Sequence, residues 1–432
     1  MEVIVTHTSI NMGIVERSLS DKNLLLPFSS GKSYLILFII WPFLAFIVAL
    51  ANYAQKEARM VVFFFLVYFG LTFVADNEAM DSFGYLETFI FYSTLPFKEF
   101  FKVLSGYYST GASMDFIEPT VTFLLSRFTR NYHIFFAVFA SLFAFFYLRS
   151  FNLLYDQYKK SPNWNAWVFM VFSIVVIPIT SLSGLRMWIA AWMFFLGAYQ
   201  LLLTRKPKYL LVALSACLMH WSFINLNLLL IVWYFAGNRN AIYTPLAIAS
   251  FFLPQFLHPM LLWVAAFTGG GIAARVEGYT GDSHSETYQE WFDSTAWFLQ
   301  LNHDMIWYFF IAAIILIRVF KRDNMKGKLE ENWYSFMLLM FTMVNFGRSL
   351  PDFGRRMQTV FILFASVYVF LYFKNLSEQR IRFITVAGAF PLLLYTFIEF
   401  RAAADSMSAW YLAPGLGLPL LDPGLSLAEV LF

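Results

Sequence analysis

The sequence predicts an all-α protein that crosses a membrane many times. Of its 432 residues, 59% are hydrophobic and only 13% are charged, whereas an ordinary soluble domain has about 25% charged residues. Apolar runs of about 20 residues, the length that spans a bilayer as a helix, recur along the chain. These observations exclude a water-soluble globular protein and leave the number of crossings as the question.

Ten apolar runs are predicted to span the membrane as helices. They cover approximately residues 34–54, 60–76, 133–154, 164–182, 185–203, 241–266, 303–320, 333–350, 357–373 and 381–399. The stretch 208–236 is too long for one comfortable crossing, so we expect two short helices that form a hairpin with His220 at its tip. The chain then crosses about twelve times within a single domain over residues 34–400.

The distribution of charge between the loops favours this hairpin. If the N-terminus is outside and 208–236 returns to the side it left, the inside loops hold seventeen Lys and Arg residues but only six Asp and Glu residues. Short inside loops rich in Lys and Arg agree with the positive-inside rule. A single crossing at 208–236 would instead move Arg239 and the basic residues of 318–328 outside.

The outer face carries the long segments, where binding and chemistry tend to be found. A polar arm over residues 1–33 precedes the first span, loops cover about 77–132 and 267–302, and a Pro/Gly-rich tail covers 401–432. Residues 77–132 alternate apolar and charged side chains, which is typical of amphipathic helices in the membrane interface. The net charge of +3 indicates no nucleic-acid surface, and the lone Cys217 excludes an intramolecular disulfide.

Four arginines lie where apolar spans meet the outer face. Arg186 opens an otherwise uncharged span, where a charge is costly unless it is paired or solvated. Arg348, Arg355 and Arg356 lie within nine residues at another outer junction. Such arginines either contact lipid headgroups or bind an anion, since the planar guanidinium suits phosphate oxygens. Three arginines outside break the positive-inside rule that the other loops obey, which favours an anion site.

His220 and Asp81 are the candidate acid–base groups. His220 lies at the hairpin tip, at the same outer level as Arg186, and is either a packing residue or a general base. Asp81 and Tyr85 are four residues apart and can share one helix face, so Asp81 could be a general base. The alternative is that Asp81 is a solvated carboxylate in a loop. No group of His, Cys or carboxylate residues has the spacing of a metal site, so we predict no metal and no cofactor.

Four short motifs, taken in order, resemble the EpsG branch of Wzy-type polysaccharide polymerases, relatives of the O-antigen polymerases and ligases. They are Asp81-Ser-Phe-Gly-Tyr85, Gly184-Leu-Arg186, His220-Trp-Ser222 and Arg355-Arg356. Ser82 stands where the family pattern usually has Tyr. The resemblance covers roughly residues 35–400 and implies a GT-C-like fold.

The resemblance implies an inverting, metal-independent glycosyltransferase in the bacterial inner membrane, with its active site facing the periplasm or outer side. Such an enzyme joins undecaprenyl-diphosphate-linked oligosaccharide repeat units and releases undecaprenyl diphosphate. Its partners would be the lipid-linked donor and acceptor glycans, the lipid bilayer and a chain-length regulator.

The resemblance also suggests roles for the candidate residues. The diphosphate would be bound by Arg186, Arg348, Arg355 and Arg356. The catalytic groups would be His220 and Asp81. Tyr85 and Ser222 would contact or orient the sugar. Fixed arginines would stabilise the negative charge that builds on the leaving diphosphate without a metal. Single displacement would invert the anomeric carbon.

Two other functions stay open on the sequence. A lipid-linked oligosaccharide flippase would also have about twelve spans and cationic cavity residues, but it should show repeated halves and charges along a central pathway. Here the charges cluster near one face. Another polyprenyl-lipid-dependent glycosyltransferase, such as an O-antigen ligase, is not separated from a polymerase by these residues.

Overall fold

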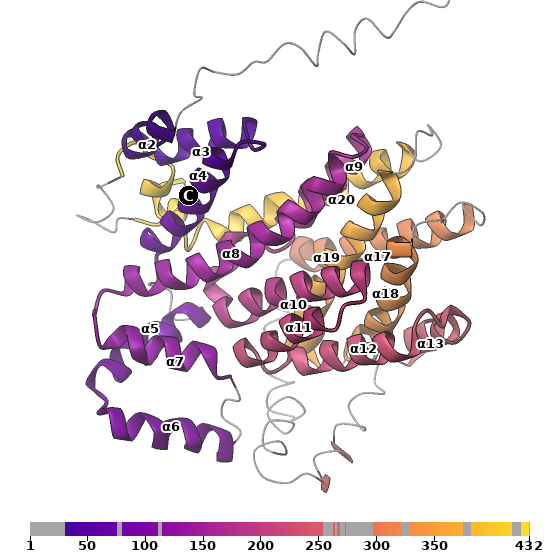
Figure 1. The fold of residues 1–432 in the computed structure, drawn as a ribbon, viewed down its shortest axis with the longest axis horizontal. Helices are drawn as coiled ribbons and strands as arrows, with labels where there is room; N and C mark the ends of the chain where they lie inside the picture. Colours follow the sequence, from indigo (N-terminus) through magenta and orange to yellow (C-terminus); the bar gives the residue numbers. More distant parts are fainter. Residues whose placement is uncertain are drawn as a thin grey trace, which may run out of the picture.

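The computed structural model shows a helical protein (Figure 1). It describes residues 31–75, 80–110, 115–253, 297–320, 328–348, 350–374, 382–416 and 425–431, with a few residues between 262 and 273. Within these ranges the only β-structure is two isolated bridges. The all-α prediction is therefore confirmed. The polar arm up to residue 30 and most of the 267–302 loop lie outside the described residues.

The helices follow the predicted order along the chain. They are α2 (Gly31–Ile40), α3 (Pro42–Ala51), α4 (Lys56–Leu71), α5 (Asp81–Thr94), α6 (Phe97–Thr110), α7 (Ile117–Ser126), α8 (Tyr132–Tyr158), α9 (Trp164–Val175), η1 (Ile179–Gly184), α10 (Leu185–Thr204), α11 (Lys208–Met219), α12 (Phe223–Ala236), α13 (Asn240–Phe252), α17 (Trp297–Phe320), α18 (Lys328–Phe346), α19 (Pro351–Phe373), α20 (Arg382–Ala403), η3 (Ala409–Tyr411) and α22 (Leu427–Leu431). The two η elements are 3₁₀ helices.

Five stretches of the described chain are long and apolar enough to cross a membrane. They are Tyr132–Tyr158, Trp164–Thr204, Leu301–Val319, Phe353–Phe373 and Arg382–Ala403. Shorter apolar helices, α2, α3, α11, α12 and α13, accompany them. The chain is thus a membrane protein with several apolar helices, and the count of about twelve crossings stays a prediction.

The first predicted span, 34–54, is wrong as one continuous helix. The chain breaks at Trp41, whose backbone is extended at φ −152° and ψ 94°, so that α2 and α3 are separate helices. Pro42 explains the break, because proline lacks an N–H donor and disfavours helical geometry at the preceding residue. The Trp41 indole N–H donates to the carbonyl of Leu412 at 2.8 Å, so the C-terminal tail packs against this break.

The predicted span at 164–182 is also wrong as a continuous α-helix. Helix α9 ends at Val175, and the chain continues through Pro178 into the 3₁₀ helix η1. Helix α10 starts directly after η1, at Leu185. The break therefore places Arg186 in the first turn of a new helix.

The chain over 208–236 forms the predicted hairpin. Helix α11 runs back along α10, and a Cβ built on Gly197 would lie 2.7 Å from the Cα of Ala213. The side-chain amide of Asn227 in α12 donates to the carbonyl of Ala213 at 3.1 Å, which joins the two arms. The guanidinium of Arg205, just after α10, lies 5.0 Å from the ring of Trp233 near the end of α12. The hairpin therefore returns to the end of α10 from which it started.

The segment that follows α4 contains short helices, α5, α6 and α7, as predicted (Figure 1). They share a small core of Tyr92, Phe100, Leu104 and Phe123, in which the rings of Phe100 and Phe123 stack 4.0 Å apart. Arg127, just after α7, covers the Phe123 ring at 4.6 Å and donates to the carbonyl of Leu95 at 3.0 Å. This unit carries its own apolar packing beside the main bundle.

We predict that Gly197→Ala lowers the free energy of unfolding by about 1–3 kcal/mol, because the added methyl group meets the backbone of α11. The matched control is Gly106→Ala in α6, where a new Cβ meets nothing within 4 Å and alanine favours the helix. Thermal unfolding of the purified protein in detergent measures both. Equal stability of the two variants would contradict the tight contact between α10 and α11.

Candidate functional site

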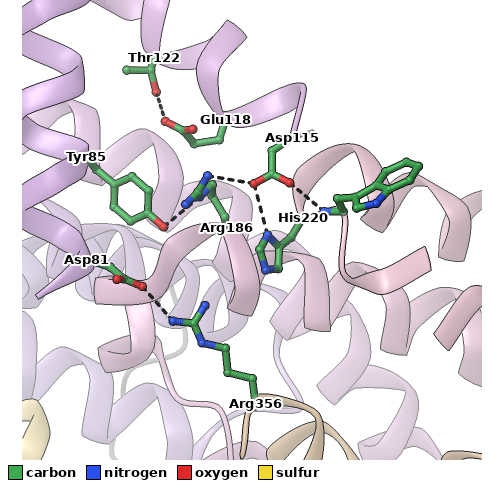
Figure 2. Close-up of polar contacts among 9 residues, drawn as sticks. Asp81, Tyr85, Asp115, Glu118, Thr122, Arg186, His220 and Arg356 are labelled. Carbon is green, nitrogen blue, oxygen red and sulfur yellow. Dashed lines mark hydrogen bonds and ion pairs between the residues drawn. The ribbon is translucent and has the colours of Figure 1, made fainter. Parts of the chain in front are cut away.

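Asp115 joins two of the predicted site residues (Figure 2). Its Oδ2 accepts a hydrogen bond from Arg186 Nη1 at 3.0 Å and lies 3.3 Å from His220 Nδ1. Its Oδ1 accepts the backbone N–H of Trp221 at 2.8 Å. The Asp115 side chain is only 3% exposed, so these donors take the place of water around the carboxylate.

Backbone contacts hold Asp115 against the hairpin tip. Asp115 lies two residues before α7, and the N–H of the next residue, Phe116, donates to the carbonyl of Leu218 near the end of α11 at 2.8 Å. Helix α11 ends at Met219, where the chain turns extended at His220. This turn points the N–H of Trp221 away from the helix ladder and toward the carboxylate.

Arg186 is held from a second side by Tyr85. The Tyr85 hydroxyl accepts a hydrogen bond from Arg186 Nε at 3.1 Å, and the guanidinium lies 5.2 Å from the Tyr85 ring centroid. Burial raises the pKa of Tyr85 to about 12, although the Arg186 charge acts in the opposite direction. Figure 2 shows the arginine between Tyr85 and Asp115, so its plane is fixed by two partners from different elements.

Asp115 is ionised, and this sets the hydrogen position on His220. Burial alone would raise the pKa of Asp115, but the hydrogen bond with His220, the charge of Arg186 and the backbone N–H of Trp221 outweigh it and hold the pKa below its usual value. An ionised carboxylate only accepts hydrogen bonds, so the Nδ1 of His220 carries the hydrogen in this contact. Burial lowers the pKa of His220, which favours the neutral imidazole, so Nε2 carries the free lone pair. This nitrogen makes no hydrogen bond within the described residues.

Glu118 is a second buried carboxyl group near Arg186. It is 5% exposed and accepts a hydrogen bond from the Thr122 hydroxyl one turn later in α7 at 2.8 Å. Burial raises its pKa, while the charge of Arg186 acts in the opposite direction. Because its pKa is raised, Glu118 adds less negative charge to that of Asp115, and Arg186 has less negative charge to balance.

Asp81 pairs with Arg356 across the site. Arg356 Nη2 of α19 lies 3.4 Å from Asp81 Oδ2 at the start of α5, and the side chains are 37% and 52% exposed. Asp81 and Tyr85 lie one turn apart on α5, as their spacing predicted, and each contacts an arginine. In Figure 2 this pair lies beside the cluster formed by Arg186, Asp115 and His220.

The remaining predicted site residues lie around these two groups. Arg348 Nη2 is 4.0 Å from Asp304 Oδ1 of α17. Arg355 of α19 is close enough to His303 and Glu399 to act on them electrostatically. Ser222 follows the hairpin tip, and its hydroxyl oxygen is buried without a hydrogen-bond partner in the described residues. Among those residues, no group of three or more His, Cys, Asp or Glu side chains could hold a metal ion.

Sequence reasoning missed Asp115 and Glu118 as site residues. Asp115 was visible only as one charged residue of an amphipathic loop. One signal was available: the segment Asp115-Phe-Ile-Glu118-Pro places two carboxylates three residues apart, with apolar residues between them. Buried acids need partners, so this pair pointed to a cation elsewhere in the chain.

Comparison with known proteins finds one matching family. A family model described as the EpsG family matches residues 60–412. The matched range includes every candidate site residue named above, from Asp81 to Arg356, together with Asp115 and Glu118. No curated protein and no solved structure matches the chain.

We predict that Asp115→Ala lowers the free energy of unfolding by about 3 kcal/mol, because it leaves Arg186 and His220 without their shared buried partner. The matched variant Asp81→Ala removes a carboxylate from a partly exposed pair and should cost less than about 1 kcal/mol. Unfolding of both variants in the same detergent tests the difference. Equal losses would contradict the central position of Asp115.

Glu118 should make stability depend on pH. Because its folded pKa is raised, its contribution to stability is complete below its ordinary value of 4.5 and is lost as the pH rises through the folded pKa. We therefore expect Glu118→Gln to gain stability relative to wild type as the pH rises from about 4 to 8. Melting temperatures across this range test the prediction. The control Glu87→Gln, at an exposed position of α5, should follow the wild-type profile.

Proposed function

Because the chain belongs to the EpsG family of Wzy-type polysaccharide polymerase-like proteins, we propose that it joins undecaprenyl-diphosphate-linked oligosaccharide repeat units and releases undecaprenyl diphosphate. The observation that supports this reaction best is the His220 imidazole oriented by a buried carboxylate beside a fixed arginine. An oriented base and fixed positive charge are what glycosyl transfer from a lipid diphosphate requires.

The proposed reaction is a single displacement. A hydroxyl oxygen of the acceptor glycan attacks the anomeric carbon of the donor, and the bond from that carbon to the diphosphate oxygen breaks. The electron pair leaves with undecaprenyl diphosphate, and the hydroxyl proton passes to Nε2 of His220. Asp115 holds the imidazole through Nδ1 and stabilises the imidazolium that forms. Attack from the face opposite the leaving group inverts the anomeric carbon.

The arginines would stabilise the charge on the leaving diphosphate. Arg186 is fixed by Tyr85 and Asp115 and offers its remaining N–H groups in one orientation. Arg356 is less constrained, since a partly exposed ion pair of this kind is worth less than about 1 kcal/mol. It can therefore exchange Asp81 for a phosphate oxygen. Arg186 as a fixed cation and Arg356 as an exchangeable one would stabilise the leaving diphosphate without a metal.

The other candidate residues would complete the binding site. Arg348, just before α19, and Arg355, in its second turn, would extend the diphosphate site. Asp81, once released by Arg356, would accept a hydrogen bond from the acceptor sugar or act as a second base. Tyr85 would keep Arg186 in place, and Ser222 would orient the hairpin tip.

The loop charges support an orientation of the site in the membrane. The site lies at the end of the bundle that the positive-inside rule places outside. We therefore infer a GT-C-like frame in the bacterial inner membrane with the site open to the periplasm or outer side. The glycan substrates would arrive there on their lipid carriers, and a chain-length regulator would act on the growing polymer.

The test uses purified protein in nanodiscs with undecaprenyl-diphosphate-linked repeat units and no added metal, and the product is a glycan ladder on a gel. Wild type should give a ladder, and His220→Ala and Arg356→Gln should lower the rate by about a hundredfold or more, since they remove a base and a charge. Arg130→Gln, which changes an exposed arginine of the same outer segment, should keep the rate.

Other outcomes would change the assignment. Protein-dependent movement of the lipid between vesicle leaflets, without a ladder, would support a flippase. Transfer of glycan only to an acceptor that lacks the undecaprenyl carrier would support a ligase. If the His220→Ala variant still gave the ladder, His220 would not take part in the reaction.

A further inference from the structure

A groove lies between α4 and α8, at the end of these helices away from the candidate site. It has a volume of about 480 Å³. The ring of Phe73, just after α4, lies 4.3 Å from that of Phe136 near the start of α8, so the two helices run in opposite directions. The groove lies toward the start of α4 and the later turns of α8. Asp81 follows the other end of α4.

The packing of the two helices closes this groove at both ends. At one end Gly70 allows close contact, since a Cβ there would lie 2.6 Å from the Cα of Ala137. At the other end the Tyr53 hydroxyl donates to Asn152 Oδ1 at 2.9 Å, and the Tyr53 ring lies 4.9 Å from that of Phe151. The groove between these two contacts is therefore preformed by the fold.

Three cations line the groove, and none of its lining residues is acidic. Lys56 is exposed at the start of α4. Arg59 is oriented by the carbonyl of Tyr53, to which its Nε donates at 3.0 Å. The guanidinium of Arg149 lies 5.1 Å from the ring of Phe145. Three basic side chains at one rim, without a carboxylate among the lining residues, favour binding of an anion.

The remaining wall of the groove is apolar and exposed. Met60 is 50% exposed, Phe64 is 51% exposed and Phe145 is 45% exposed. A free inorganic anion would use the cations and leave this apolar wall without a partner. A hydrocarbon chain would cover the wall and bury apolar surface at the same time. Charge and apolar surface together therefore suit an amphipathic anion better than a free one.

We propose that this groove binds an anionic membrane lipid. Its headgroup phosphate lies among Lys56, Arg59 and Arg149, and a hydrocarbon tail lies along Met60 and Phe64. The loop charges place this rim at the inside face, where juxtamembrane basic residues meet anionic lipid headgroups. The site is separate from the proposed glycan site, and its test does not depend on the activity of the protein.

The experiment is native mass spectrometry of delipidated full-length protein in detergent, with phosphatidylglycerol, phosphatidylcholine or inorganic phosphate added. We expect one phosphatidylglycerol to bind with at least tenfold preference over phosphatidylcholine. The double variant Lys56→Gln and Arg149→Gln should lose that preference. Met60→Trp, which fills the groove without changing the charge, should reduce binding of phosphatidylglycerol to a similar extent.

The matched control is the double variant Lys159→Gln and Lys160→Gln, which removes the same charge just beyond α8 and outside the groove. It should keep the preference for phosphatidylglycerol. If both double variants lost the preference for phosphatidylglycerol equally, the preference would come from general surface charge, and the proposal would be overturned. Inorganic phosphate that binds as tightly as phosphatidylglycerol, or a Met60→Trp variant that binds like wild type, would overturn it as well.

Discussion

The geometry of the candidate site depends on one buried carboxylate. An isolated charge in an apolar bundle carries a large desolvation cost, so Asp115 is compatible with this fold only where donors surround it. Those donors come from the first turn of α10 and from the side chain and backbone of the hairpin tip. A shift of any of these elements would leave a buried charge or a buried donor unpaired. Asp115 therefore couples the segment that contains α5, α6 and α7 to α10 and the hairpin.

Helix breaks make these contacts available. The donors of a continuous helix are bonded within the helix, so a backbone N–H can serve a side chain only where the helix ends. The chain turns at His220 between α11 and α12, and it enters α10 through the 3₁₀ helix η1. Interrupted helices are tolerated in a membrane protein where neighbouring protein groups satisfy the backbone. Here the interruptions bring Arg186 and Trp221 to the same carboxylate.

Composition and charge distribution were enough to predict an all-α chain and the hairpin at 208–236. They also singled out Arg186 and His220, which the structure brings to one carboxylate. The break at Trp41 could also have been read from Pro42, because proline has a local effect on the preceding residue. The role of Asp115 could not be read in this way. Its partners Arg186 and His220 lie 71 and 105 residues away, and no periodic pattern relates positions at such distances. Only the folded chain shows which loop carboxylate meets the arginine.

The balance of charge at the site determines how an anion could enter it. Asp115 neutralises Arg186 in a buried contact, and Asp81 neutralises Arg356 in a more exposed and longer one. The proposed diphosphate could not displace Asp115 without leaving a buried carboxylate unpaired, whereas it would displace Asp81 into solvent at little cost. In the proposed reaction, binding of the anion to Arg356 and release of Asp81 would therefore be a single exchange. The exchange would free an acceptor on α5 at the moment when the substrate arrives, while the orientation of His220 stays fixed.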